Sequence, residues 1–410
     1  MTSAPSIPLG VGDRGSVAIS GRYANRHALV AGATGTGKTY TLATMAEGFS
    51  RAGVPSLVVD VKGDLAGLVR SNPGEILDPF GVEGRPARLD VWRLGADLIA
   101  RALELSEAQS GALDVGFEVA RLRGLPLRDL ADLRQLLGLL IRDGEAISEE
   151  VGLVSASSVA AVQRAALRLE RDASGAFGSP FLDVGTLERH GPDGRGWVSV
   201  MAAARLTRTP GLYGALCAHI LTEIFDRFPE VGDLDRPRLA VFLDEAHLIF
   251  DGAPVALARR IESIVRLVRS RGVALVFVTQ SPADLPPGIA GQLQNRIQHG
   301  LRGVTPADLR AIRAAADTLP RSEGLDVYRA IEGLGVGLAL VSVVGPGGVP
   351  SPVDVVKIRP PFARLGTLTE GEKADRRPVL ISSTPAHFPD APAVVTVQPA
   401  RRGFIARLFR

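Results

Sequence analysis

The stretch GATGTGKT, residues 32–39, decides how the rest of this sequence is interpreted. It has the spacing G-x-x-x-x-G-K-T, which is typical of the phosphate-binding loop of nucleoside triphosphatases. The apolar run ALVA at residues 28–31 predicts a buried strand before it, and residues 40–49 predict a helix after it. A strand, a glycine-rich loop and a helix in this order are the context that the motif requires. The alternative, a glycine-rich turn with a chance lysine, fits this context less well.

Each part of the loop has an expected role at a triphosphate. Gly32, Gly35 and Gly37 let the backbone turn tightly and bring N–H groups to phosphate oxygens, and the helix dipole adds to the attraction. We expect Lys38 to reach the β- and γ-phosphates and the Thr39 hydroxyl to ligate Mg²⁺. The residues expected to contact the nucleotide are Gly32, Ala33, Thr34, Gly35, Thr36, Gly37, Lys38, Thr39 and Tyr40.

The lysine at position 38 is unusual for this composition. The chain contains 4 lysines and 43 arginines, so arginine is its usual cation. A compact ammonium on a flexible stem fits between phosphates where a planar guanidinium would not. Lys38 is therefore expected to be chemically required, and Lys62 is a candidate for a second such position.

Composition limits the class of protein. A chain of 410 residues with 46% hydrophobic and 22% charged residues fits one large globular domain with an insertion, or two domains. The net charge of +3 is too small to require a polyanionic partner. The single cysteine, Cys217, excludes a disulfide framework and lies in a helical apolar pattern typical of a core. The N-terminus does not resemble a signal peptide, and the most apolar window, 334–344, is too short for a membrane span, so we expect a cytoplasmic protein.

The pattern of apolar runs predicts an α/β fold with a mostly parallel sheet. We expect strands at 27–31, 56–60, 196–200, 238–244, 272–280 and 296–302, and a terminal β pair near 336–344. Leucine and alanine at helical spacing predict helices at 98–105, 112–122, 130–141 and 159–170. The predicted segments are a first part of the nucleotide-binding core at 1–93, a helical insertion at 94–190, a second part of the core at 191–345, and a proline-rich irregular tail with a basic end at 346–410.

Two acidic residues follow the apolar run that ends at residue 243. A buried strand would bring Asp244 and Glu245 to its carboxyl end, beside the phosphate loop. Asp244 would hold Mg²⁺, and Glu245 would orient and polarise the attacking water as a general base. The alternative for this pair is a cluster that caps a helix. Asp60 and Asp64, which flank Lys62, either support the Mg²⁺ shell or cap a turn, and the turn is favoured.

Two more residues are candidates for the catalytic site. Gln280 ends the next apolar strand, where its side chain could touch the γ-phosphate or the water, although a turn residue is the simpler interpretation. Arg269 follows Glu262 and Arg266 at helical spacing, which by default predicts a solvated, salt-bridged face. The functional alternative is that Arg269 reaches the γ-phosphate of a neighbouring subunit and stabilises charge in the transition state.

These residues together resemble one family. GATGTGKTYTL, VVDVKGDL, FLDEAHLIF, RRIESIVRLVRSRGVALVFVTQ and QNRIQHGLR are similar to segments of the bacterial HerA-helicase-like ATPases, in a subgroup once catalogued only as a domain of unknown function. The helical insertion is similar too, and the resemblance covers residues 7–344. It assigns Lys38, Thr39, Asp244, Glu245 and Gln280 to the family's ATP site, with Arg269 as a finger candidate.

The resemblance implies a RecA-like core and a homohexameric ring with ATP and Mg²⁺ at subunit junctions. It places the chain in the HerA/FtsK group, whose known members pump or unwind DNA. Archaeal HerA carries an N-terminal β-barrel that the 26 residues before the first predicted strand cannot form, so functions that depend on this barrel are not expected.

Three functions remain after the sequence is considered. The first is an ATP-driven DNA translocase or helicase, supported by the resemblance and by arginines such as Arg205 and Arg208 in a loop that could face a pore. The second is an ATPase that acts on a protein partner, for which the basic end at 401–410 could be a hook. The third is a nucleotide-binding module that does not hydrolyse, against which the complete set of site residues argues.

Overall fold

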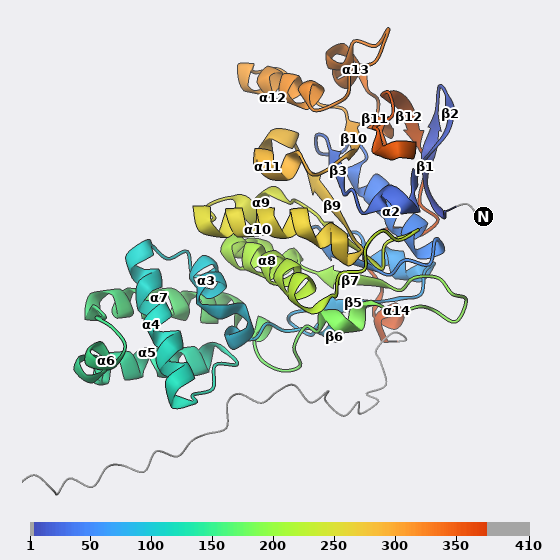
Figure 1. Cartoon of the computed structure of the whole chain (residues 1–410). Coiled ribbons are helices and arrows are strands. Elements are labelled where there is room, and N and C mark those ends of the chain that lie inside the picture. The colour runs from blue at the N-terminus through green and yellow to red at the C-terminus, as the bar shows by residue number, and fades with distance from the viewer. Residues whose placement is uncertain (1–3, 375–410) are drawn as a thin grey trace, which may run out of the picture.

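Within residues 4–374, which the computed structural model describes, twelve strands form one sheet (Figure 1). Their order is β2-β1-β12-β11-β10-β3-β9-β8-β4-β7-β5-β6, and the eight strands from β10 to β6 are parallel. The remaining four continue the sheet in antiparallel pairs. The strands are β1 (Ser6–Gly12), β2 (Gly15–Ser20), β3 (Ala28–Ala31), β4 (Ser56–Asp60), β5 (Gly74–Asp78), β6 (Arg85–Pro86), β7 (Val198–Ala202), β8 (Leu239–Leu243), β9 (Val273–Thr279), β10 (Asn295–His299), β11 (Leu338–Ser342) and β12 (Asp354–Ile358).

The central parallel strands are apolar throughout because helices cover both faces of the sheet. On one face, Leu29 and Val241 belong to a core shared with α8 (Pro210–Arg227) and α10 (Val255–Leu267). On the other face, α2 (Lys38–Arg51) packs on Val30 and Phe242. Alternate residues of each strand therefore belong to opposite cores, as the two-residue repeat of a strand requires. This confirms the predicted α/β core.

Five helices form a lobe beside the sheet (Figure 1, teal to green). They are α3 (Val91–Ala102), α4 (Glu107–Arg123), α5 (Leu130–Arg142), α6 (Gly144–Glu150) and α7 (Ala156–Ala173). Side-chain caps define several of their starts: Asp90 accepts a hydrogen bond at α3, Asp129 at α5 and Ser155 at α7. The lobe contains all four helices that the leucine spacing predicted, and α6 was not predicted.

The other α-helices of residues 4–374 lie outside this lobe and are short, except for α12. They are α1 (Gly21–Ala24), α9 (His247–Phe250), α11 (Pro287–Ala290), α12 (Pro306–Asp317), α13 (Val327–Gly333) and α14 (Glu370–Ala374). None of the helices within residues 4–374 combines the length and the hydrophobicity that a membrane crossing requires.

The two ends of the described chain differ from the sequence-based expectation. Residues 6–20 form the β1–β2 hairpin, where no strand was predicted, and β12 lies inside the segment expected to be irregular from residue 346. β12 alternates buried and less buried residues between flanking prolines, and this short alternation is easily missed in a proline-rich segment. The basic end at 401–410 lies outside the described residues.

The chain after β12 links the helix α2 to the segment that follows β4. The buried carboxylate of Glu47, on α2, accepts the backbone N–H groups of Phe362 and Ala363 at 2.8 and 2.7 Å. Arg70 binds Glu372 through two nitrogens, and the backbone N–H of Gly366 donates to the carbonyl of Asp64. Residues 359–373 therefore connect the helix after the phosphate loop to the turn after β4.

Candidate nucleotide site

The sheet register brings the phosphate loop, the acidic pair and Gln280 together at the carboxyl ends of the parallel strands. Ala31 of β3 pairs with Thr279 of β9, so the phosphate loop begins beside Gln280. Leu243 of β8 pairs with Phe277 of β9 and with Val59 of β4, so β8 and β4 end at the same edge. Parallel strands in open α/β sheets present their ligand sites at the carboxyl ends. The phosphate loop, Asp244, Glu245 and the turn after β4 therefore lie at a single edge of the sheet.

The glycines of the loop have conformations that other residues rarely adopt. Gly35 and Gly37 have φ angles of +79° and +120°. A Cβ atom at Gly32 would lie 2.5 Å from the Cβ of His299, so a side chain at this position would clash. The helix α2 begins directly after Gly37 without a side-chain cap, so the first N–H groups of the helix face the loop. Thr34 and Gly35 are exposed at the mouth of the loop, as is Tyr40, which is 55% exposed.

The Lys38 ammonium is folded onto its own loop. Its Nζ atom donates hydrogen bonds to the carbonyl oxygens of Gly32 and Ala33 at 2.5 and 3.0 Å, and the residue is buried. Burial and the positive charge of Lys62 lower the pKa of Lys38, while the charges of Glu245 and Asp244 oppose this change. A buried ammonium held only by carbonyl dipoles would gain from an anion in the loop. This is the arrangement that a phosphate-binding lysine needs.

Asp244 is a buried carboxylate at the end of β8. Burial raises the pKa of Asp244 to about 7, and the negative charges of Glu245 and Asp60 act in the same direction while Lys62 opposes them. A divalent cation beside this carboxylate would favour its ionised form. Asp244 therefore fits a Mg²⁺ ligand, and Thr39, the second residue of α2, stays a predicted ligand.

Glu245 has an unusual backbone and a charged partner. Its φ angle is +44°, in the left-handed region that non-glycine residues rarely adopt. Its Oε1 atom lies 2.9 Å from Nζ of Lys62. Burial alone would raise the pKa of Glu245, but the hydrogen bond and the charge of Lys62 outweigh it, so the pKa is lowered.

Lys62 and Asp60 show what the turn after β4 does. Asp60 accepts backbone N–H groups of Lys62, Gly63 and Leu65 at 3.1, 2.8 and 2.8 Å, which agrees with the turn-capping interpretation. This cap fixes the turn and directs the Lys62 side chain toward Glu245. The scarcity of lysine was the only sequence signal for Lys62, and the contact with Glu245 was not predicted.

His299 is a structural residue of the site that sequence reasoning did not identify. It ends β10, next to β3, and its Nε2 atom lies 2.8 Å from the Thr41 hydroxyl of α2 while its Nδ1 atom lies 2.9 Å from the carbonyl of Leu338. Burial lowers the pKa of His299 to about 4, so the ring is neutral at pH 7. The His299 ring therefore supports the phosphate loop from its protein side.

Gln280 contacts the loop through its backbone. Its carbonyl oxygen accepts the N–H of Gly32 at 3.2 Å, and its side chain is exposed. A catalytic role for the side chain stays a prediction.

Arg269 lies at the opposite end of β9 from the phosphate loop. It precedes β9, whose seven residues span about 20 Å at roughly 3.3 Å per residue. It lines a cavity of about 300 Å³ with Arg22, Tyr23, Arg26, Asp233, Gly347 and Gly348. Burial and the charge of Arg26 lower the pKa of Arg269. Within residues 4–374 its guanidinium forms no hydrogen bond or ion pair.

The arginines near Arg269 differ from it. Arg266 is exposed and pairs with Glu262 at 3.3 Å, as the salt-bridged interpretation predicted. Arg271 donates to the carbonyl of Phe228 and lies over the ring of Phe225. Arg269 is thus the arginine of this segment that is available to a ligand, and it cannot reach the phosphate loop of its own chain.

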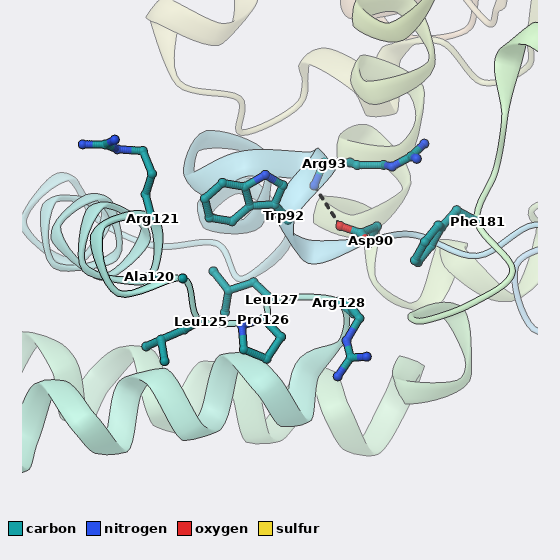
Figure 2. A pocket seen from close by; sticks show the side chains of 11 residues that line it. Asp90, Trp92, Arg93, Ala120, Arg121, Leu125, Pro126, Leu127, Arg128 and Phe181 are labelled. Atoms are coloured by element: carbon teal, nitrogen blue, oxygen red, sulfur yellow. Dashed lines mark hydrogen bonds between the residues drawn. The ribbon is translucent and has the colours of Figure 1, made fainter. Parts of the chain in front are cut away.

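A second cavity, of about 590 Å³, lies in the helical lobe and contains none of the predicted site residues (Figure 2). It lies between the start of α3, the end of α4 and the connection to α5, which is held to α3 by a hydrogen bond from Trp92 N–H to Leu127 O at 2.7 Å. Its walls are Trp92, Leu125, Pro126, Leu127 and Phe181, with Arg93, Arg121 and Arg128 at its rim.

The comparisons with known proteins agree with this geometry. The family model described as Helicase HerA-like C-terminal matches residues 11–72 and 69–382. An unbound structure of the bacterial conjugative coupling protein TrwB has a TM-score of 0.60 at 17% identity, covering 88% of this chain and 91% of that one. VirB4 of Thermoanaerobacter pseudethanolicus has a TM-score of 0.63 at 14% identity, covering 88% and 98%. No curated protein matches the sequence significantly. The chain belongs to the Helicase HerA-like C-terminal family.

Proposed function

We propose that this protein hydrolyses ATP and works as a ring-shaped motor that moves DNA. One observation carries the proposal: a phosphate loop with two adjacent acids lies at the carboxyl ends of the parallel strands, and Arg269, whose guanidinium has no hydrogen bond or ion pair within residues 4–374, lies at the opposite ends. In a head-to-tail ring, opposite edges of neighbouring subunits meet, so such an arginine can complete the next subunit's site.

Nucleotide and Mg²⁺ binding has support from similar structures. Structures of the plasmid coupling protein TrwB in complex with the ATP analogue ADPNP and with ADP and Mg²⁺ have TM-scores of 0.59 and 0.58 to this chain. Another contains the GTP analogue GDPNP, so the fold also accepts guanine nucleotides in that protein. We propose that the N–H groups of the loop and Lys38 bind the triphosphate here.

The residues at the carboxyl ends of the parallel strands suggest a different role for each during ATP hydrolysis. Lys38 leaves the loop carbonyls and neutralises charge on the β- and γ-phosphates. Glu245 accepts a proton from the water that attacks the γ-phosphorus, and the β–γ phosphoanhydride bond breaks to release ADP and phosphate. Asp244 and Thr39 would hold Mg²⁺, which when bound neutralises charge on the phosphate oxygens.

Arg269 is proposed to act on the neighbouring subunit. Its guanidinium has no hydrogen-bond or ion-pair partner in the part of the chain that the structure describes, and it lies far from its own loop, so both observations favour this role over a role in its own site. Arg22 and Arg26 line the same cavity, and the charge of Arg26 lowers the pKa of Arg269 while Asp233 opposes this change, so the three arginines outnumber the one carboxylate and favour an anion here. A γ-phosphate is an anion that a ring would bring there.

DNA is the proposed substrate, and its effect on ATP hydrolysis tests the proposal. We expect DNA to raise kcat for ATP severalfold at low salt, and the stimulation to fall steeply as salt increases because phosphate contacts release counterions. The measurement is the rate of phosphate release with and without double-stranded DNA between 50 and 300 mM salt. An ATPase rate that DNA leaves unchanged, together with no salt-dependent binding, would exclude DNA as the substrate.

A second candidate, action on a protein partner, is favoured by the cavity in the helical lobe (Figure 2). Its apolar floor and arginine rim match an acidic peptide with one large apolar side chain. Arg121 pairs with Glu118 at an exposed position, whereas Arg128 pairs with Asp132, whose side chain is only 11% exposed. The exposed Arg121–Glu118 pair contributes little, so a ligand carboxylate can replace Glu118.

We expect a fluorescent peptide of glutamates around a central phenylalanine to bind the protein, and Leu125→Asp to weaken binding at least tenfold. In Leu125→Asp, the new carboxylate would lie among the apolar side chains that form the floor of the cavity. Leu153→Asp, at a position 91% exposed in the same lobe, is the matched control and should bind normally. Fluorescence anisotropy measures both. Equal affinity for the two variants would show that the cavity is not the docking site.

A further inference from the structure

The contact between Lys62 and Glu245 occupies the proposed general base. Lys62 Nζ lies 2.9 Å from Glu245 Oε1, and the glutamate side chain is only 10% exposed. A partly buried ion pair is screened less than one on the surface. While this contact is intact, the Lys62 ammonium occupies one acceptor site of Glu245 Oε1 and competes with a water molecule for this oxygen.

The second oxygen of Glu245 has no hydrogen-bond partner. Oε2 is buried, and within residues 4–374 neither it nor the nearby Nδ1 atom of His247, 3.5 Å away, forms a hydrogen bond. An unsatisfied buried carboxylate oxygen costs free energy, as does the left-handed backbone at this residue. The observed arrangement therefore holds Glu245 in a costly conformation, which Lys62 stabilises.

We propose that Lys62 is a positioning residue that latches Glu245 and keeps basal ATP hydrolysis slow until an anionic group of the substrate draws the ammonium away. This inference rests on the proposed ATPase function and adds a mode of regulation to it. A DNA phosphodiester is the anion that the proposed substrate would supply.

The surroundings of Lys62 provide a place for such an anion. Lys62 lines a cavity of about 250 Å³ that Arg205 also lines. The guanidinium carbon of Arg205 lies 3.8 Å from the ring centre of Phe80, and this arginine forms no ion pair within residues 4–374. Two cations from different turns thus converge on one cavity.

The carboxylates that line this cavity have other partners. Asp60 caps the turn after β4, and Asp78 accepts the backbone N–H groups of Phe80, Val82 and Glu83. Glu83 pairs with Lys373 at 2.6 Å. These carboxylates are already engaged, which leaves Lys62 and Arg205 to meet an anionic ligand.

The test compares Lys62→Met with the wild-type protein. Methionine keeps the length of the side chain and removes its charge. We expect basal kcat to rise about threefold or more with little change in KM for ATP, and DNA to give no further stimulation.

Two further variants separate a latch from a general structural effect. Lys62→Arg keeps a cation and should restore slow basal hydrolysis, whereas Lys357→Met, at an exposed position on β12, should leave basal kcat unchanged. Retained ATP binding by Lys62→Met shows that the variant is folded.

Several results would overturn the latch. They are a lower kcat in Lys62→Met, a raised KM at constant kcat, or DNA stimulation retained in this variant. If DNA instead has no effect on the wild-type protein while Lys62→Met still has a raised basal rate, the DNA function fails and the anionic trigger must be another group. If neither protein hydrolyses ATP, both proposals are wrong.

Discussion

Replacing Glu245 by glutamine lowers kcat for ATP by about 10²–10⁴-fold, the range that a positioned general base contributes, and leaves ATP binding nearly unchanged. The amide keeps the size of the side chain but cannot accept the proton of the attacking water. The amide also removes the negative charge that faces Lys62. Any small change in the affinity for the anionic nucleotide should therefore be an increase. Phosphate release under single-turnover conditions and a fluorescent ATP-binding titration measure the two effects separately.

The control for this variant is a change at an acid with a different task. Asp308 caps α12 by accepting the N–H groups of Val304 and Thr305, far along the chain from the phosphate loop. Asp308→Asn should retain hydrolysis. If Glu245→Gln hydrolyses ATP at the wild-type rate, then another group activates the water and the assignment of Glu245 is wrong.

Arg269→Ala and Lys38→Ala should each be inactive alone, and mixing them should recover activity. Loss of an arginine finger costs about 10³–10⁵-fold in kcat, and loss of the phosphate-binding lysine removes the site itself. In a mixed ring, an intact Lys38 of an Arg269→Ala subunit can face an intact Arg269 of a Lys38→Ala subunit. Random mixing of equal amounts makes about a quarter of the junctions complete in a head-to-tail ring.

Activity as a function of the mixing ratio measures this prediction, with a maximum expected near equal amounts. Arg266→Ala is the matched control, because Arg266 lies on the same segment but is exposed and paired with Glu262. This variant should be active alone. If mixed rings form and stay inactive at every ratio, Arg269 does not act across the junction.

The phosphate loop and the acidic pair could be predicted from the sequence because each is a contiguous stretch. Gly32, Lys38 and Thr39 are fixed by their spacing, and Asp244 follows an uninterrupted apolar run. Parallel strands covered on both faces are apolar throughout, so β4, β8 and β9 were also recognisable. Local chemistry and local periodicity were sufficient for these features.

The contacts between distant segments could not be predicted in the same way. The pair Lys62–Glu245 depends on β4 lying next to β8, and the support of the loop by His299 depends on β10 lying next to β3. Strand order is a property of the whole sheet, and single-strand patterns do not contain it. The hairpin β1–β2 and β12 were missed because short, half-buried strands between glycines and prolines give weak patterns.

The surroundings of Arg269 also could not be predicted from the local sequence pattern. Helical spacing placed it with Arg266 on one surface, but the helix α10 ends at Leu267 and Arg269 lies in the 3₁₀ turn that follows. This change of geometry separates the two arginines and turns Arg269 toward Arg26 and the cavity at that edge. The sequence identified Arg269 as a candidate, and the fold shows that it lies too far from the phosphate loop of its own chain to act there.

An electron cryo-microscopy map of the Glu245→Gln protein with ATP and Mg²⁺ would show whether a composite ATP site forms at a subunit junction. We expect a ring in which the triphosphate lies between the phosphate loop of one subunit and Arg269 of the next. A map with ATP on the phosphate loop of an isolated subunit, or a ring with Arg269 remote from every nucleotide, would contradict it.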